Sequence, residues 1–552
     1  MKIRKRDSDG GLFNRMIKNP MVQYAGIISY MILLIMRIPL SKAIGDAGVG
    51  LFAPAYEIFF LITIFTAYSM TKAMAALIRY RVKREQYKNA KTAFRAAFSM
   101  NLCISAVAAL LLFVASGFIA GILVLEPFCR MAVMTVAPVI VFAAFIGIFR
   151  GYFDGFGLGV LTAHSQYIES VSMAVCAFCF GEICYLYGTK VAALRQDSVY
   201  GYAYGALGAM LGVLISQIIT MVHLLVVYVV YSGTLRGKLG MDGSKRLEAQ
   251  SSLQGMVLRG SLPLAVSGIL FNLYMIIDQR MFNYCMNKRE LGQERTALWG
   301  CYYGKYAVLI GLGAALGVWS VYTAAGRISN AYERGEYRVM RERIGKAVSR
   351  LCIIGFPIAI YLAALAGAVS ACLYKGGSDA LTAWVQKGAV IIILYGICFL
   401  FGQIMYRVHM IRELIFTTVI SLAVHVLAAY ILVQKALLGA DGIIYAMILS
   451  FALCGVSNFL LVSRNLKYRP EWLGGIVFPA AAAGVSGVVV AILSRFLLEP
   501  LGGMLTILIG ILAGLFFYIT FLMVLRVIGE AELSRMPLGF FFIMLGKNLG
   551  VL

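Results

Sequence analysis

The segment MVQYAGIISYMILLIMRIPLSKAI, residues 21–44, is a long apolar run with one arginine, Arg37, well inside it. A run of about 20 apolar residues is long enough to cross a bilayer as a helix. A guanidinium is effectively always charged, so placing it at bilayer depth is costly unless it faces a partner or a watery cavity. The segment therefore predicts a membrane-spanning helix, and Arg37 is its first candidate for a functional residue.

The rest of the chain has the same character. Of its 552 residues, 61% are hydrophobic and 13% are charged, and the mean hydropathy is +0.85. Soluble domains carry about 25% charged residues, so we expect an all-α polytopic membrane protein. Apolar runs of about 20 residues predict about fourteen transmembrane helices. These runs lie near residues 21–44, 51–76, 96–124, 130–149, 166–188, 202–230, 256–285, 299–325, 348–374, 383–406, 414–434, 442–463, 473–494 and 503–525.

The net charge of +24 is concentrated in alternate loops. The basic clusters occur at residues 2–6, 79–95, 236–246, 327–350 and 464–469. Cytoplasmic loops of membrane proteins carry an excess of Lys and Arg, so this pattern predicts that both termini are cytoplasmic. Because membrane topology accounts for the charge, no nucleic-acid partner is expected.

Neither a metal site nor an enzyme is indicated. The 11 cysteines are scattered, and the one CxxC pair, Cys176 and Cys179, lies in an apolar helix without a second pair. The four histidines show no metal-ligand spacing, and no phosphate-binding GxxxxGK[ST] motif occurs. No large extramembrane loop is available for a catalytic site, so neither an enzymatic activity nor a cofactor is expected. The first apolar run is too long for a cleavable signal peptide.

An internal repeat predicts the domain organisation. Residues 83–87 read KREQY and residues 333–337 read ERGEY, each between two helical stretches, and their numbers differ by 250. GYFDGFG at 151–157 and GQIMYRV at 402–408 occupy equivalent places, 251 residues apart.

We therefore expect two six-helix lobes, 1–230 and 256–463, related by a pseudo-two-fold axis and joined by a basic cytoplasmic linker, 231–255. Residues 464–552 would add two transmembrane helices and a cytoplasmic tail. A parallel repeat of this kind is typical of transporters whose substrate site lies between the lobes. The chain is expected to act as a monomer.

Five ionisable residues lie deep in the predicted helices. Arg37, Arg280 and Lys305 make the core lean positive, which suits an anionic headgroup such as a diphosphate, so we predict that they bind substrate. Glu57 and Asp278 are predicted to act in gating or ion pairs, and Asp278 is a candidate partner for Arg37. A structural ion pair that locks the two lobes together is the alternative.

Other residues have a simpler interpretation. Tyr302, Tyr303 and Tyr306 beside Lys305 are candidates for stacking on sugar rings or, alternatively, for a membrane-interface belt. Arg150 lies near a helix end, where basic side chains usually reach to the interface, so it is expected to be an anchor. Gly510 and Gly514, at GxxxG spacing, predict close helix packing in the last span, and a groove for a lipid tail is the alternative.

Four segments together resemble a known family. RIPLSKAIGDAGVGLF at 37–52, RYRVKREQYKNAKTAFR at 79–95, FRGYFDGFG at 149–157 and SNAYERGEYRVMRERI at 329–344 are similar to the stage V sporulation protein B branch of the MurJ-like polysaccharide flippases. These belong to the MATE/MOP exporter superfamily. The ordered series covers most of the first twelve predicted helices.

The resemblance implies two six-helix bundles around a cationic cavity and export of an undecaprenyl-diphosphate-linked saccharide, lipid II or a related precursor. Arg37 falls on the first-helix arginine of the family, and Lys305 falls near a cavity arginine of the lipid II branch. Ile62 and Thr63 stand where that branch has a second-helix arginine, which favours the broader sporulation and polysaccharide branch.

We therefore expect an alternating-access flippase for a lipid-linked saccharide in the bacterial cytoplasmic membrane, with the membrane potential or a coupling cation as the energy source. A cation-coupled multidrug exporter of the MATE type is the alternative. Such an exporter should have an acidic, aromatic site, whereas the core residues named above lean positive.

Overall fold

The computed structural model describes residues 20–240, 242, 247–292, 294–374, 378–534 and 539–548. The regular structure within these ranges is entirely helical, as the composition predicted. The basic residues of the predicted clusters at 2–6 and 236–246 lie outside the described side chains.

The chain forms two compact units. The first contains Met1–Lys305 and Val433–Gly439, and the second contains Tyr306–Leu432 and Ala440–Leu552. The helices of the first unit are α2 (Pro20–Gln23), α3 (Ala25–Thr63), η1 (Ile64–Ser69), α4 (Met70–Lys83), α5 (Tyr87–Phe118), η2 (Ile119–Leu123), η3 (Pro127–Cys129), α6 (Arg130–Gly155), α7 (Gly159–Arg195), α8 (Val199–Gly240), α9 (Gln250–Asn272), α10 (Tyr274–Lys288) and α11 (Arg295–Cys301).

The short η4 (Tyr302–Tyr306) ends at the boundary between the units. The helices that follow are α12 (Ala307–Trp319), α13 (Ala324–Glu333), α14 (Tyr337–Ala364), α15 (Ala366–Leu373), α16 (Asp379–Gly388), α17 (Ile391–Arg407), α18 (Ile411–Ala429), η5 (Tyr430–Lys435), α19 (Ala440–Asn465), η6 (Leu473–Val477), α20 (Phe478–Val524), α21 (Glu530–Leu533) and α22 (Gly539–Asn548).

The number of transmembrane helices agrees with the prediction. Eleven helical stretches of the described chain are long and apolar enough to cross a membrane, and the bent pair Asp379–Gly388 and Ile391–Arg407 makes a twelfth. Two of the stretches, Ala25–Lys83 and Leu473–Val524, have 59 and 52 residues, more than twice the roughly 20 that one span needs. Each is broken at a glycine in a left-handed conformation, Gly45 and Gly502, both with φ of 72°. Each stretch is long enough for two spans, one on each side of its glycine, which brings the number within the described chain to fourteen.

The sequence repeat corresponds to a repeated turn. In KREQY, α4 ends at Lys83 and α5 begins at Tyr87, and in ERGEY α13 ends at Glu333 and α14 begins at Tyr337. The third residue of each motif has positive φ, 59° at Glu85 and 73° at Gly335. The fourth residue has nearly the same conformation in both, with φ/ψ of −86°/62° at Gln86 and −80°/60° at Glu336.

The division into units differs in position from the predicted lobes. Helices α9 to α11, which the repeat would assign to the second lobe, pack within the first unit. The units are defined by which helices contact one another, whereas the repeat is defined by the order of the helices along the chain. The lobe boundaries at 230 and 256 therefore stay a prediction.

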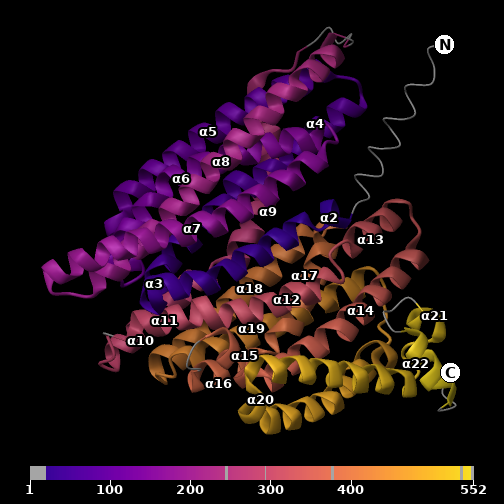
Figure 1. Cartoon of the computed structure of the whole chain (residues 1–552). Coiled ribbons are helices and arrows are strands. Elements are labelled where there is room, and N and C mark those ends of the chain that lie inside the picture. Colours follow the sequence, from indigo (N-terminus) through magenta and orange to yellow (C-terminus); the bar gives the residue numbers. More distant parts are fainter. Residues whose placement is uncertain are drawn as a thin grey trace. The chain divides into compact units, whose positions relative to one another are not determined.

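Close helix packing builds the first unit, in which α5, α6 and α8 lie side by side (Figure 1). Three glycines four residues apart, Gly147, Gly151 and Gly155, form one face of α6 against η1 and α4. A Cβ at Gly147 would lie 2.7 Å from Ala67 Cα, and one at Gly151 would lie 2.8 Å from the Thr71 carbonyl oxygen. Without side chains on this face the two backbones approach directly, as small residues allow in membrane helices.

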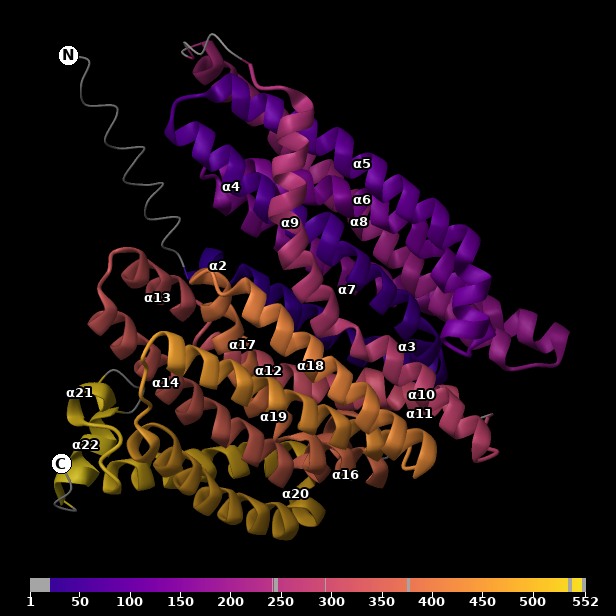
Figure 2. The ribbon, with the colours of Figure 1, turned by 180° about the vertical axis from the view of Figure 1, so that it is seen from behind.

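The last two spans belong to the second unit and pack on α14. A Cβ at Gly514 would lie 2.9 Å from the Tyr361 ring, and one at Gly510 would lie 2.9 Å from a Leu365 methyl carbon. The Tyr361 hydroxyl donates to the Gly514 carbonyl oxygen at 2.7 Å. The close packing predicted from the GxxxG spacing is confirmed, and Figure 2 shows α20 from behind.

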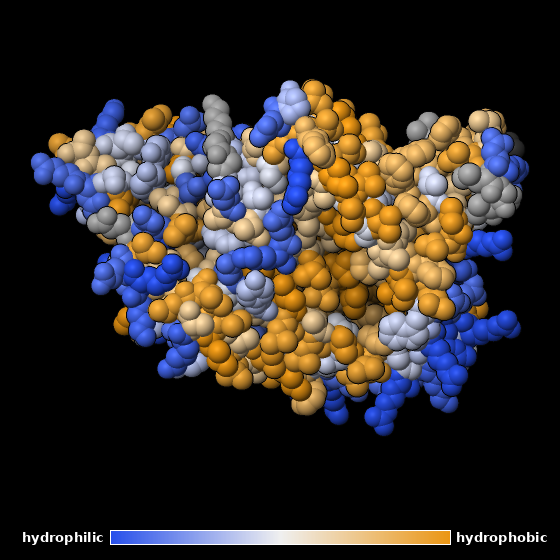
Figure 3. All heavy atoms as spheres, turned by 90° about the horizontal axis from the view of Figure 1, so that it is seen from below, coloured by the Kyte–Doolittle hydropathy of each residue, from blue (hydrophilic) through white to orange (hydrophobic). Residues whose placement is uncertain are grey.

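The surface is that of a protein in lipid. Figure 3 shows a broad area of apolar side chains on one face, with hydrophilic side chains most numerous at its left and lower right. Along α5, Val107, Leu110, Leu111 and Val114 are 58–76% exposed, which is expected where a helix faces acyl chains rather than water.

Replacing Gly151 by Leu should destabilise the first unit, because the new side chain meets the backbone of Thr71 and α6 has to move away from α4. Overpacking of this kind costs about 1–3 kcal/mol or more, so a lower melting temperature in detergent is expected. Gly121→Leu is the matched control, since a Cβ there meets nothing within 4 Å. Equal melting temperatures for the two variants would contradict the packing described for α6.

Candidate functional site

The bend at Gly45 brings Arg37 and Glu57 together, although both belong to α3. An Nη atom of Arg37 lies 3.7 Å from a carboxylate oxygen of Glu57. The two residues are only 7% and 9% exposed. Arg37, which was predicted to lie deep in a span, thus has an anionic partner in the next span of the chain.

Two tyrosines complete this group. The Arg37 guanidinium carbon lies 4.0 Å from the centre of the Tyr303 ring and 5.4 Å from that of Tyr56. The Tyr303 hydroxyl donates a hydrogen bond of 2.6 Å to the Glu57 carboxylate. Buried cation–π contacts stabilise by about 2 kcal/mol. We refer to Arg37, Tyr56, Glu57 and Tyr303 as the Arg37 cluster.

The guanidinium retains unused donor capacity. Its separation from Glu57 exceeds the 2.7–3.2 Å typical of a hydrogen bond. The buried Nε of Arg37 makes no hydrogen bond to any described residue. Glu57 therefore neutralises the charge of Arg37 without occupying its hydrogen-bond donors.

Contact between α3 and α11 places Tyr303 beside Arg37. A Cβ at Gly50 would lie 2.1 Å from the Thr296 carbonyl oxygen, and one at Gly300 would lie 1.7 Å from the Asp46 carbonyl oxygen. The two helices thus touch through their backbones, and only glycine fits at both positions. Tyr303 follows Gly300 by one turn and reaches the cluster.

Lys305 has its own partner close by. Its ammonium nitrogen lies 2.8 Å from a carboxylate oxygen of Asp46, the residue after the bend. The side chains are 17% and 30% exposed. Lys305 was predicted to bind substrate, and the structure places it two residues from Tyr303 in a direct ion pair.

The structure places Asp278 and Arg280 on different faces of α10. Asp278 is fully buried, whereas Arg280 is exposed and donates to the Ile122 carbonyl oxygen at 2.8 Å. Arg280 therefore contacts η2. A substrate-binding role of Arg280, and the pairing of Asp278 with Arg37, stay predictions.

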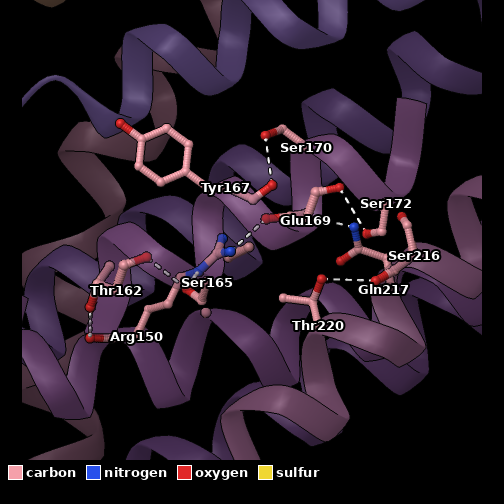
Figure 4. A network of polar contacts seen from close by, with 12 residues as sticks. Arg150, Thr162, Ser165, Tyr167, Glu169, Ser170, Ser172, Ser216, Gln217 and Thr220 are labelled. Atoms are coloured by element: carbon pink, nitrogen blue, oxygen red, sulfur yellow. Dashed lines mark hydrogen bonds and ion pairs between the residues drawn. The ribbon is translucent and has the colours of Figure 1, made fainter. Parts of the chain in front are cut away.

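A second polar group lies between α6, α7 and α8 (Figure 4). Arg150 contacts Glu169 at 2.6 Å and donates to the Ser165 hydroxyl at 2.8 Å. Gln217 donates to the other oxygen of Glu169 at 2.8 Å. Arg150 was expected to be an interfacial anchor, but its side chain is only 14% exposed and its charge is paired inside the bundle.

Sequence reasoning missed Gln217, a fully buried polar residue of α8. The signal was present, because SQIIT at 216–220 brings three polar side chains into an apolar span.

A third group of contacts joins the ends of several helices of the first unit. The Glu126 carboxylate accepts hydrogen bonds from Arg295 at 3.1 Å and from Thr296 at 2.8 Å. The Glu126 side chain is only 3% exposed. Asn283 donates to the Val124 carbonyl oxygen at 2.8 Å. These bonds hold α10 and α11 against the segment between η2 and η3.

Within the described ranges, no group of three or more His, Cys, Asp or Glu side chains is arranged to hold a metal ion. The described side chains thus offer buried, paired charges and aromatic rings, an arrangement suited to binding a charged group.

Comparisons with known proteins agree with this fold. The model of a family described as polysaccharide biosynthesis protein matches residues 21–312, more than half of the chain. Stage V sporulation protein B of Bacillus subtilis (strain 168) is 22% identical over 521 residues, which is 93% of this chain and 96% of that protein.

Two solved structures share the fold at low sequence identity. The lipid II flippase MurJ in an inward closed conformation is 14% identical with a TM-score of 0.60, over 91% of this chain and 97% of that one. An inward-facing multidrug resistance MATE family transporter of the MOP superfamily is 15% identical with a TM-score of 0.58, over 82% and 98% of the two chains.

Replacing Glu126 by Gln should lower the melting temperature, because the buried carboxylate is the partner of Arg295 and Thr296. Breaking a buried ion pair costs about 3–5 kcal/mol of unfolding free energy. Because Arg295 is partly exposed, we expect a loss of about 3 kcal/mol or less. The same change at Glu342, whose pair with Lys346 is exposed, should have no detectable effect. The measurement is thermal unfolding in detergent, and equal shifts for both variants would contradict a structural role of Glu126.

Proposed function

The chain belongs to the polysaccharide biosynthesis protein family, and on this basis we propose that it is a flippase for an undecaprenyl-diphosphate-linked saccharide. It would move lipid II or a polysaccharide precursor across the cytoplasmic membrane by alternating access. The observation that carries this proposal is Arg37, a buried guanidinium in a membrane span with unused hydrogen-bond donors.

The chemistry of Arg37 fits a diphosphate. A guanidinium presents five N–H donors in a planar fork that matches phosphate oxygens two at a time. Charge-assisted bonds of this type are about twice as strong as neutral ones. Tyr56 and Tyr303, which pack on Arg37, hold the fork in a fixed plane, and the diphosphate would approach its free edge.

The membrane potential can supply the energy. Moving one negative charge out of a cell with a negative interior is favoured by about 2.3 kcal/mol per 100 mV. The polyprenyl tail stays in lipid throughout, so the protein has to shelter only the polar headgroup. A coupling cation in place of the potential is the second energy source that we expected, and it stays a prediction.

Further properties belong to the same proposal. The protein is a multi-pass membrane protein without enzymatic activity, like the transporters and the flippase that share its fold. We propose that it lies in the bacterial cytoplasmic membrane as a monomer with both termini in the cytoplasm. The basic residues that flank the described turn between α4 and α5 support this orientation.

The alternative function, multidrug export, has one observation in its favour. The Arg37 cluster contains a carboxylate and two tyrosines, and Asp46 adds a second carboxylate nearby. Acidic and aromatic residues are what an organic cation requires. Binding measurements with undecaprenyl diphosphate and with an organic cation such as tetraphenylphosphonium separate the two functions.

Replacing Arg37 by Ala should weaken binding of undecaprenyl diphosphate at least tenfold, because a charged hydrogen-bonding group is worth about 1.5–3 kcal/mol. Binding is measured with the purified protein in nanodiscs, and Arg338→Ala is the control because Arg338 is exposed. Unchanged affinity for undecaprenyl diphosphate, or loss of binding to the organic cation instead, would overturn the flippase proposal.

Transport by proteoliposomes should depend on the membrane potential. With the donor side negative, export of a labelled undecaprenyl-diphosphate saccharide is expected to be several-fold faster than at zero potential, because the field acts on the anionic headgroup. The potential is set with a potassium gradient and valinomycin. A rate that does not respond to the potential would exclude the potential as the driving force and leave the coupling cation.

A further inference from the structure

Each of three cations inside the first unit has a carboxylate partner. Arg37 lies beside Glu57, Lys305 beside Asp46, and Arg150 beside Glu169. The sequence predicted a core that leans positive. The structure places each of these three cations beside a carboxylate, so each pair has no net charge when both of its groups are ionised.

The three pairs differ in how tightly they are closed. The nitrogen–oxygen distances are 2.8 Å in the Lys305 pair and 2.6 Å in the Arg150 pair, which are hydrogen-bond distances. The distance in the Arg37 pair is 3.7 Å, and Nε of Arg37 makes no hydrogen bond to any described residue. At this separation the charges still attract, because Coulomb energy falls only as the inverse of distance, but no hydrogen bond has formed.

Glu57 has a second partner that holds it in place. The Tyr303 hydroxyl donates to the same carboxylate oxygen that faces Arg37, at 2.6 Å. Glu57 would therefore keep a strong hydrogen bond if an anion took over the guanidinium. Glu169 also has a second partner, Gln217, at 2.8 Å, but Glu169 and Asp46 each contact their cation at hydrogen-bond distance, whereas Glu57 does not.

We propose that Glu57 is the resident counter-ion of the transport site. It neutralises Arg37 when the site is empty, and the anionic headgroup displaces it from the guanidinium while Tyr303 retains it. This proposal rests on the proposed function, since it takes a diphosphate as the displacing group. Glu57 acts through Arg37 and is a positioning residue.

The counter-ion determines which step of transport feels the membrane potential. With Glu57 ionised beside Arg37, the cluster of the empty protein has no net charge, so the field exerts no net force on it during the return step. With substrate bound, the headgroup adds its own negative charge, and the field acts on the loaded step. The potential would thus drive export without opposing or assisting the return of the empty site.

The test is the charge that the substrate-free protein moves when the potential is stepped, measured electrically on proteoliposomes. The wild type should move no net charge through the cluster. Glu57→Gln leaves Arg37 unbalanced and should move up to one positive charge per protein, and Arg37→Ala should move up to one negative charge. The double variant R37A/E57Q should again move none. Glu57→Gln keeps an oxygen that can accept from Tyr303, so it is expected to fold.

Glu248→Gln is the control. This substitution also removes one carboxylate from an ion pair, but the pair is with Arg81 and lies outside the Arg37 cluster. It should leave the charge movement as in the wild type. A wild type that already moves a full charge, or two single variants that move charge of the same sign, would overturn the counter-ion role.

Binding of undecaprenyl diphosphate at zero potential separates this proposal from the function on which it rests. Glu57→Gln should bind several-fold more tightly than the wild type, because the competing carboxylate is gone, and Arg37→Ala should bind more weakly. If Arg37→Ala weakens binding but Glu57→Gln leaves the affinity unchanged, the counter-ion role is wrong and the flippase proposal stands. If neither variant changes binding, the flippase proposal itself is wrong.

Discussion

The structure of the first unit depends on the need to accommodate a charged guanidinium inside a membrane span. A charge at bilayer depth is tolerated only with partners, and Arg37 obtains them from its own helix and from η4. The break at Gly45 turns α3 back on itself, so that Glu57, twenty residues further along the chain, comes to lie beside Arg37. Without this left-handed glycine the two residues would lie about 30 Å apart on one straight helix.

The second requirement is a direct contact between two backbones. Gly50 and Gly300 let α3 and α11 touch, and the ion pair of Asp46 with Lys305 lies next to that contact. The same contact positions Tyr303 for both of its interactions, the cation–π contact with Arg37 and the hydrogen bond to Glu57. The site is thus built on packed helices rather than on loops, which suits a group that has to keep a fixed geometry.

Much of the fold could be predicted from the sequence, because lipid imposes long apolar segments and these are visible in composition alone. The turn at KREQY recurs at ERGEY with matching backbone angles, so even a weak repeat indicated true structural equivalence. Arg37 and Glu57 were predicted as important residues for the same reason, since any buried charge stands out in an apolar span. Their pairing with each other could not be predicted, because it depends on the direction of the chain after Gly45.

Arg150 shows where prediction from position fails. Its place near the end of α6 is typical of an anchor that reaches toward water. Instead, Arg150 contacts Glu169 and Ser165 of α7, and Gln217 of α8 binds the same Glu169, so the side chain lies inside the bundle. A basic side chain takes whichever environment solvates it better, and the sequence does not show which helices surround it. The partner of Lys305 was missed for the same reason, since Asp46 is 259 residues away in the chain.

The pairing of every one of these cations changes how a positively charged site should be understood. A core with three unpaired cations would attract an anion strongly and would release it slowly, because the full Coulomb attraction would have to be overcome at each release. Pairing each cation with a carboxylate reduces the attraction between the site and the anion. A carrier needs this, because it has to release its substrate as well as bind it. Among the three pairs, that of Arg37 is the one whose nitrogen–oxygen distance, 3.7 Å, exceeds a hydrogen bond. The specificity for an anion can therefore lie in the geometry of a single guanidinium, while the neighbouring pairs keep the surrounding charge close to zero.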